Sequence, residues 1–94
     1  MYAVVFDLDT SCLSEQYHVD SSNNAYGDIR KFMEANGFEW RQGSVYFGNP
    51  TITAVTCVVT VQRLAQQYPW FASCARDVRM LRIEENNDLL PAIR

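Results

Sequence analysis

The chain has 94 residues and a formal net charge of −3, and 48% of its residues are hydrophobic. A chain of this length forms one core, so we expect residues 1–94 to be a single domain, and the high apolar content excludes a disordered or low-complexity protein. The acidic charge does not exclude RNA as a partner. Seven of the eight basic residues are arginine, the side chain that forks onto phosphates and stacks on bases.

The cysteines and the apolar runs indicate where in the cell the protein is expected. Cys12, Cys57 and Cys74 show no C-x-x-C spacing, so we expect neither a disulfide framework nor a zinc site, and we expect a reducing cytoplasm. The apolar run after Met1 ends at Phe6, which is too short for a signal sequence, and no apolar span of about 18 residues occurs. We therefore expect neither export nor a membrane span.

The first part of the chain predicts a strand, a loop and a helix. Residues 2–6 are continuous, apolar β-formers, typical of a central strand. Residues 8–22 are mostly polar and predict a long loop. Apolar residues then recur at helical spacing up to the stop signal Asn36-Gly37, which predicts a helix over residues 23–36.

The second part predicts a hairpin, a helix and a last strand. Residues 38–42 and 44–47 read as two strands joined by a tight turn at Gly43. Residues 51–68 are rich in β-branched side chains, but their apolar residues step at i, i+3 and i+4 and the run is too long for a strand, so we predict a helix. After a turn at residues 70–73, residues 77–84 predict a strand that a polar tail follows.

The order βαββαβ predicts an α+β, ferredoxin-like fold. Its four-stranded antiparallel sheet has the spatial order 4-1-3-2, with both helices on one face. The first strand then lies between the third and the fourth, so its carboxyl end is beside the amino ends of both neighbours. We expect three polar residues to converge at that edge of the sheet, with three arginines nearby: Asp7, Ser44 and Asp77, and Arg41, Arg76 and Arg79.

The stretch FDLDT resembles the start of the haloacid dehalogenase phosphatases, in which the first Asp is a nucleophile and the second a general acid. The resemblance is partial, because Ser11 stands where that motif has Thr or Val. That fold also needs a later lysine and a later acidic pair on a sheet too large for this chain. We therefore do not interpret Asp7 as a phosphatase nucleophile.

A more specific resemblance is carried by three segments, MYAVVFDL, AYGDIRKFMEANGFEWRQGSVY and WFASCARDVRMLRIEENND. Together they resemble the virulence-associated protein D (VapD) family, small ferredoxin-like proteins related in fold to CRISPR-associated nucleases. The resemblance implies a bacterial, cytoplasmic homodimer that acts as an endoribonuclease toxin, commonly encoded beside a small antitoxin protein. The family's strand-end acid, its Gln-Gly-Ser turn and its Arg-Asp-Val-Arg stretch fall on Asp7, on Gln42, Gly43 and Ser44, and on residues 76–79.

Three residues are catalytic candidates on this resemblance. RNA cleavage needs a group that activates a 2′-hydroxyl or water, and groups that stabilise charge at the phosphate. Asp7 is then a base or a metal ligand, or else a carboxylate that caps the next turn. Ser44 either hydrogen-bonds the phosphate and positions the nucleophile or is an ordinary turn residue. Asp77 is either a second carboxylate or the ion-paired residue that orients Arg76 and Arg79.

The candidates for RNA contact are charged and aromatic. Arginines bind phosphates or form an ordinary solvated surface, and Trp40, Tyr46 and Phe47 either stack bases on the open face of the sheet or fill the core. The expected RNA-binding residues are Arg41, Gln42, Tyr46, Arg76 and Arg79.

No metal site is predicted with certainty. No group of His, Cys and carboxylates has the spacing of a fixed transition-metal site, and His18, the single histidine, excludes a two-histidine mechanism within one subunit. Mg²⁺ held by Asp7 from two subunits across a dimer axis is left open.

A sheet with both helices on one face leaves its other apolar face open, which predicts a homodimer with two such faces packed together. Tyr2, Val4 and Phe6, or the alternating Ala3 and Val5, must lie on that face. The expected function is cleavage of single-stranded RNA by the toxin of a toxin-antitoxin pair. The alternative is a catalytically inactive nucleic-acid-binding or protein-interaction module of the same fold.

Overall fold

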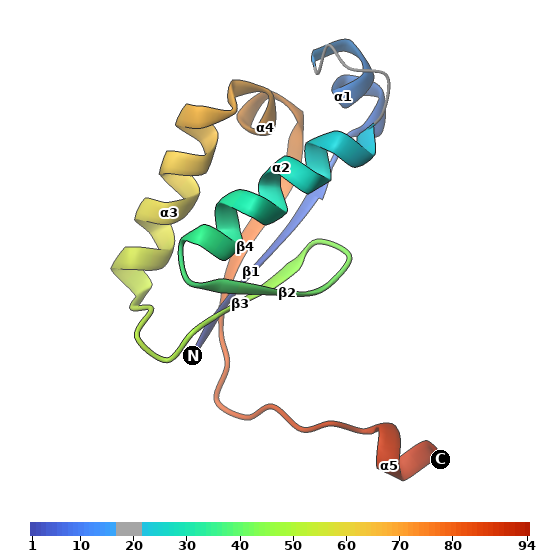
Figure 1. Cartoon of the computed structure of the whole chain (residues 1–94), viewed down its shortest axis with the longest axis vertical. Helices are drawn as coiled ribbons and strands as arrows, with labels where there is room; N and C mark the ends of the chain where they lie inside the picture. The colour runs from blue at the N-terminus through green and yellow to red at the C-terminus, as the bar shows by residue number, and fades with distance from the viewer. Residues whose placement is uncertain (17–21) are drawn as a thin grey trace.

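A computed structural model describes residues 1–16 and 22–94. Residues 17–21, which include His18, lie outside the described residues. Figure 1 shows the elements in chain order: β1 (Tyr2–Leu8), α1 (Thr10–Gln16), α2 (Ser22–Ala35), β2 (Phe38–Gln42), β3 (Val45–Gly48), α3 (Ala54–Gln67), α4 (Pro69–Cys74), β4 (Ala75–Arg82) and α5 (Leu90–Ile93).

The sheet has the order β2-β3-β1-β4, and each pair of neighbours is antiparallel. In the central strand, Val4 lies opposite Tyr46 on one side and Met80 on the other. The helices α2 and α3 lie on one face of this sheet (Figure 1). The predicted α+β, ferredoxin-like topology with the order 4-1-3-2 is therefore confirmed.

The core lies between the sheet and these helices. Alternation along β1 turns Val4, Phe6 and Leu8 toward the helices, where each is 5% exposed or less. Phe6 stacks on Tyr46 with ring centroids 6.0 Å apart and meets Phe71 of α4 edge-on at 5.4 Å. Burial of β1 on this side holds the following residue, Asp7, at a fixed place on the opposite face.

The prediction of a loop over residues 8–22 is wrong in part, because Thr10–Gln16 forms α1. Asp9 begins this helix: its carboxylate accepts the backbone N–H of Cys12 at 3.1 Å, and its carbonyl oxygen accepts the N–H of Leu13. Leu13 alone is fully buried in α1, so the segment carries too few apolar residues to show a helical period.

The predicted turn at residues 70–73 is also a helix, α4, which begins with Pro69 at its first turn. The tail contains a further short helix, α5, and runs away from the sheet (Figure 1). Within residues 1–16 and 22–94, no helix is long and apolar enough to cross a membrane.

The expectation of no disulfide is wrong. Cys12 of α1 and Cys74 of α4 are joined, with their Cα atoms 5.4 Å apart and 62 positions apart in sequence. Cys57 is buried and free. The spacing rules missed the pair because it joins two helices, α1 and α4, that were predicted as loop and turn.

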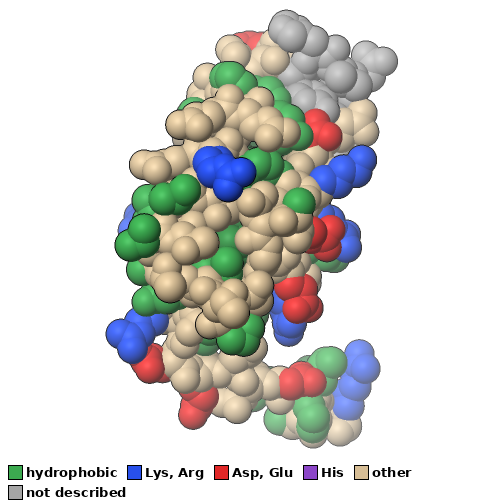
Figure 2. Space-filling model, turned by 60° about the vertical axis from the view of Figure 1, so that its left-hand side comes forward, with side chains coloured by type: hydrophobic (Ala, Val, Ile, Leu, Met, Phe, Trp, Pro, Cys, Tyr) green, Lys and Arg blue, Asp and Glu red, His purple; other side chains and the backbone are tan. Residues whose placement is uncertain are grey.

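The face of the sheet opposite α2 and α3 carries Ala3 and Val5, flanked by Phe47 of β3 and Leu81 of β4. Leu81 is 48% exposed. Figure 2 brings the α3 side forward: hydrophobic groups are scattered over it, and acidic and basic groups lie mostly toward its margins, with a basic group also near its middle. The exposed apolar side chains on α3 and the tail are Val55, Val58, Val59, Leu89, Leu90 and Ile93.

Candidate active site

Two carboxylates face each other at one end of the sheet. Asp7 of β1 is the direct antiparallel partner of Asp77 of β4. Residues directly opposite share a face of the sheet, with Cβ atoms about 4.5–5.5 Å apart. Because Phe6 and Leu8 are buried and Asp7 is exposed, this pair lies on the face opposite the core. The predicted convergence of Asp7 and Asp77 is confirmed.

Arg79 neutralises one member of this pair. Its Nε–H donates to both carboxylate oxygens of Asp77, at 2.9 and 3.1 Å. Within the part of the chain that the structure describes, no hydrogen bond or ion pair involves the carboxylate of Asp7. The two acids are thus unequal: Asp77 orients Arg79, whereas Asp7 has no such partner among residues 1–16 and 22–94.

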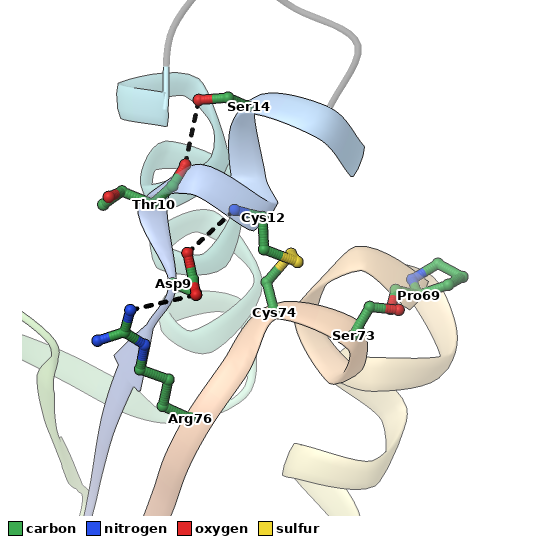
Figure 3. The surroundings of a disulfide bond; sticks show 8 residues. All are labelled: Asp9, Thr10, Cys12, Ser14, Pro69, Ser73, Cys74 and Arg76. Carbon is green, nitrogen blue, oxygen red and sulfur yellow. Dashed lines mark hydrogen bonds and ion pairs between the residues drawn. A yellow bond between two sulfur atoms is a disulfide. The ribbon is translucent and has the colours of Figure 1, made fainter.

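Arg76 has a different partner from the one expected. Its Nη2 donates to Oδ2 of Asp9 at 3.1 Å, as Figure 3 shows, so Asp77 does not orient it. The cause is a β-bulge: Asp77 pairs with Asp7 and Ala75 with Leu8, which leaves Arg76 without an opposite residue. A bulge turns a side chain out of the regular alternation, here toward Asp9.

Asp9 therefore links α1 to β4. The backbone N–H of Cys12 and, second, the guanidinium of Arg76 lower the pKa of Asp9 below its ordinary value of 3.8. Figure 3 shows the Cys12–Cys74 disulfide beside this ion pair, between α1 and the start of β4. The sequence signal for this role was present, since Asp9 directly before a short polar helix is a typical N-cap.

Ser44 adjoins the two acids through the backbone. The carbonyl oxygen of Ser44 accepts the N–H of Phe6 at 3.2 Å. Ser44 therefore lies beside the residue that directly precedes Asp7 in β1. Ser44 itself lines a cavity with Tyr26 and Tyr46 on the helix side of the sheet. Asp7 and Ser44 are thus close along the sheet edge but belong to opposite faces.

Two of the expected RNA-binding residues, Arg41 and Gln42, lie at the end of β2, where Arg41 contacts an aromatic ring and Gln42 faces solvent. A second bulge leaves Arg41 without an opposite residue, since Trp40 pairs with Tyr46 and Gln42 with Val45. The guanidinium of Arg41 lies 5.0 Å from the centroid of the Phe47 ring, and Gln42 is exposed.

Tyr46 does not lie on the open face of the sheet. It is only 2% exposed and packs in the core on the helix side, so of the two alternatives for its ring, core packing is confirmed and stacking of bases on the open face is not. The reason is alternation: Tyr46 pairs with Val4, whose side chain faces the helices. Burial raises the pKa of Tyr46 to about 12, against the opposing charge of Arg30 and with a smaller contribution from Glu34, so its phenol stays protonated near neutral pH.

Asp7 and Asp77 fit a loosely held Mg²⁺ better than a fixed metal. Within residues 1–16 and 22–94, no three His, Cys, Asp or Glu side chains form a metal-binding group. Mg²⁺ accepts one or two carboxylates and takes its remaining ligands from water and phosphate. Asp7, with Asp77 beside it, would hold the ion, which would supply charge neutralisation at the phosphate.

Comparisons with known proteins agree with this fold. Residues 1–89 match the family model described as CRISPR associated protein Cas2. The chain is 60% identical over 93 residues to Endoribonuclease VapD 2 of Riemerella anatipestifer, covering 99% of both chains. It is 66% identical over 94 residues to the Endoribonuclease VapD homolog of Helicobacter pylori, covering 100% of this chain and 97% of that one.

A more distant relative aligns over the same length. Endoribonuclease VapD of Dichelobacter nodosus is 35% identical over 96 positions, covering 100% of this chain and 98% of the relative. Because the identity extends over the whole chain and the family model covers residues 1–89, the chain belongs to the VapD family of endoribonucleases and contains a Cas2-like domain.

Proposed function

We propose that this chain cleaves single-stranded RNA and that Asp7 accepts the proton of the attacking hydroxyl group. The observation that carries the proposal is the inequality of the two opposed acids. Asp77 is bonded twice to Arg79, whereas Asp7 is exposed on the sheet face. An exposed carboxylate beside an oriented guanidinium supplies a base and a phosphate-binding group at one place.

The arginines take the phosphate in this proposal. Arg79 bonds to Asp77 through its Nε–H. Among the described residues its two terminal amino groups make no hydrogen bond, so Arg79 can still donate to a phosphate through them. Arg76 uses one terminal nitrogen on Asp9, which holds it at the same end of β4. Arg76 and Arg79 are each held by a separate carboxylate. Their positive charges favour the binding of a phosphate beside Asp7 and Asp77, whose negative charges alone would repel it.

The proposal extends to the partners and the cell. Residues 1–94 act as one domain in a homodimer that packs through the apolar side chains Val5, Phe47 and Leu81. Asp7 and Asp77 lie on the same face, so the sites of the two subunits adjoin this interface. The protein is a toxin held inactive by a small antitoxin protein, and the Cys12–Cys74 disulfide removes the argument for a reducing cytoplasm that the cysteine spacing had offered. The dimer is tested with Leu81→Lys, which puts a charge on that face of the sheet. Gel filtration with light scattering should give the mass of a dimer for the parent and of a monomer for the variant. A monomeric parent would refute the dimer.

The cleavage test uses end-labelled single-stranded RNA with the purified chain, in Mg²⁺ and in EDTA. Asp7→Asn keeps the shape of the side chain but cannot accept a proton, and Glu85→Gln makes the same chemical change on the exposed tail as a control. We expect product with the parent and with Glu85→Gln, and a loss of about 100-fold or more with Asp7→Asn. Equal cleavage by all three would remove Asp7 from catalysis, and bound but uncleaved RNA would favour the inactive binding module.

The toxin proposal has its own test. Expression of the parent should arrest bacterial growth, and Asp7→Asn expressed to the same level should not. Arrest by both proteins would separate toxicity from RNA cleavage.

A further inference from the structure

A cavity of about 480 Å³ lies between α2 and the β2–β3 hairpin. Its size is within the range of small-molecule sites, about 300–1,000 Å³. Helix α2 contributes Tyr26, Gly27 and Arg30, and the hairpin contributes Trp40 and Ser44. It is on the opposite side of the sheet from Asp7, so it is a separate surface from the carboxylate pair.

Trp40 and Arg30 form a cation–π pair in this cavity. The guanidinium carbon of Arg30 lies 4.5 Å from the centroid of the Trp40 ring. The indole N–H of Trp40 donates to the carbonyl oxygen of Gly43 at 2.9 Å, which satisfies the only polar group of the ring and fixes its orientation. Trp40 nevertheless remains 38% exposed, so a rigid aromatic surface is offered to solvent.

Gly27 keeps the cavity open. Glycine inside a helix costs about 1 kcal/mol relative to alanine, and a Cβ at Gly27 would meet no atom within 4 Å. Close packing within the chain therefore does not explain this glycine, which lies in the interior of α2. A group that enters the cavity from solvent would approach the backbone at this position.

The cavity suits a nucleobase better than a phosphate. Among the described residues, Arg30 is the one charged side chain that lines the cavity. Its Nε is 3.4 Å from the carboxylate of Glu34, so an anion would meet little net positive charge. A base has a flat apolar face, which stacks on tryptophan and on arginine regardless of sequence.

The cavity is also close to the carboxylate pair around the edge of the sheet. The carbonyl oxygen of Ser44, a lining residue, bonds to the N–H of Phe6. Desolvation, followed by the charge of Asp7, raises the pKa of Tyr26, so Asp7 lies within electrostatic reach of the cavity. A nucleotide whose base enters the cavity has its backbone near this edge.

We propose that this cavity binds one unstacked base of single-stranded RNA, with the base stacked on the part of the Trp40 ring that Arg30 leaves exposed. The inference rests on the proposed RNA substrate. It assigns a base-binding subsite that is separate from the carboxylate pair Asp7 and Asp77. Gly27 gives the base room, and Ser44 and Tyr46 supply hydroxyl groups for its polar edge.

The test observes Trp40 directly. Trp70→Phe keeps an aromatic ring on α4 and leaves Trp40 as the only tryptophan, so fluorescence then reports on the cavity. Titration with a short single-stranded RNA should quench Trp40, because a stacked base quenches indole emission. The same RNA with one base removed at successive positions should lose quenching at one position.

Two replacements of Gly27 provide matched controls. Alanine and leucine raise the helix propensity at position 27 by similar amounts. Gly27→Ala does so without filling the cavity, whereas Gly27→Leu fills it. We expect Gly27→Leu to weaken RNA binding about ten- to a hundred-fold, as expected for the loss of one stacked base, and Gly27→Ala, which adds one methyl group, to weaken it less. Circular dichroism and a thermal melt check that both variants fold.

The outcomes separate this inference from the proposed cleavage. Quenching of Trp40 by RNA in a protein that cleaves nothing would refute the nuclease proposal and support the base subsite. Cleavage without quenching, or quenching that Gly27→Leu leaves unchanged, would overturn the base subsite and leave the nuclease proposal standing.

Discussion

Reduction of the Cys12–Cys74 disulfide should strongly destabilise the fold. The two residues are 62 positions apart, so the bond excludes most extended conformations of the unfolded chain. Loop-closure entropy for this separation corresponds to about 4 kcal/mol of stability at room temperature. That is a large share of the stability of a small domain, about 5–15 kcal/mol, and corresponds to a fall of roughly 15–30 °C in melting temperature.

The assay is urea unfolding of the parent and of the double variant Cys12→Ser/Cys74→Ser, each with and without dithiothreitol. The parent should lose stability on reduction and then match the double variant, which the reductant should not affect. Cys57 is buried and unpaired, so thiol titration of the unfolded, unreduced parent should find one free thiol. Three free thiols, or a midpoint that reduction leaves unchanged, would refute the reasoning.

Three further changes test the packing and the electrostatics. The pKa of Asp9 is lowered in the folded state, so its contribution is present above the unfolded pKa and is lost as pH falls through the folded pKa. The melting temperatures of the parent and Asp9→Asn should therefore differ at neutral pH and converge in acid; a constant difference would contradict this. Gly27→Ala should raise the free energy of unfolding by about 1 kcal/mol, since the added Cβ meets no atom within 4 Å; a loss in urea unfolding would show hidden crowding. Phe71→Ala should cost about 3–5 kcal/mol, because Phe71 is 2% exposed and contacts Phe6; a loss below about 1 kcal/mol in the same assay would show that the site collapses.

The sheet was predictable from the sequence because its signals are local. The apolar run ending at Phe6, the turn at Gly43 and the helical spacing after Pro50 each depend on neighbouring residues. Together they determine the element order, and chain connectivity then allows few topologies. The edge that joins Asp7 and Asp77 followed from that topology, and the register confirms it.

The errors arose where contacts distant in sequence decide the outcome. Helix α1 has little apolar periodicity and is held by Asp9, Arg76 and the disulfide to Cys74. The face on which Tyr46 lies depends on its pairing with Val4 across the sheet.

The sequence by itself determined the four strands and the two long helices, their order and the placement of Asp7 at the end of a central strand, because propensity and periodicity act over a few residues. Only the tertiary structure decided which groups those residues meet. The bulge at Arg76 turns it from Asp77 to Asp9, and the guanidinium of Arg30 on α2 lies over the Trp40 ring of β2. Such pairings depend on strand register and helix packing, which no local pattern encodes.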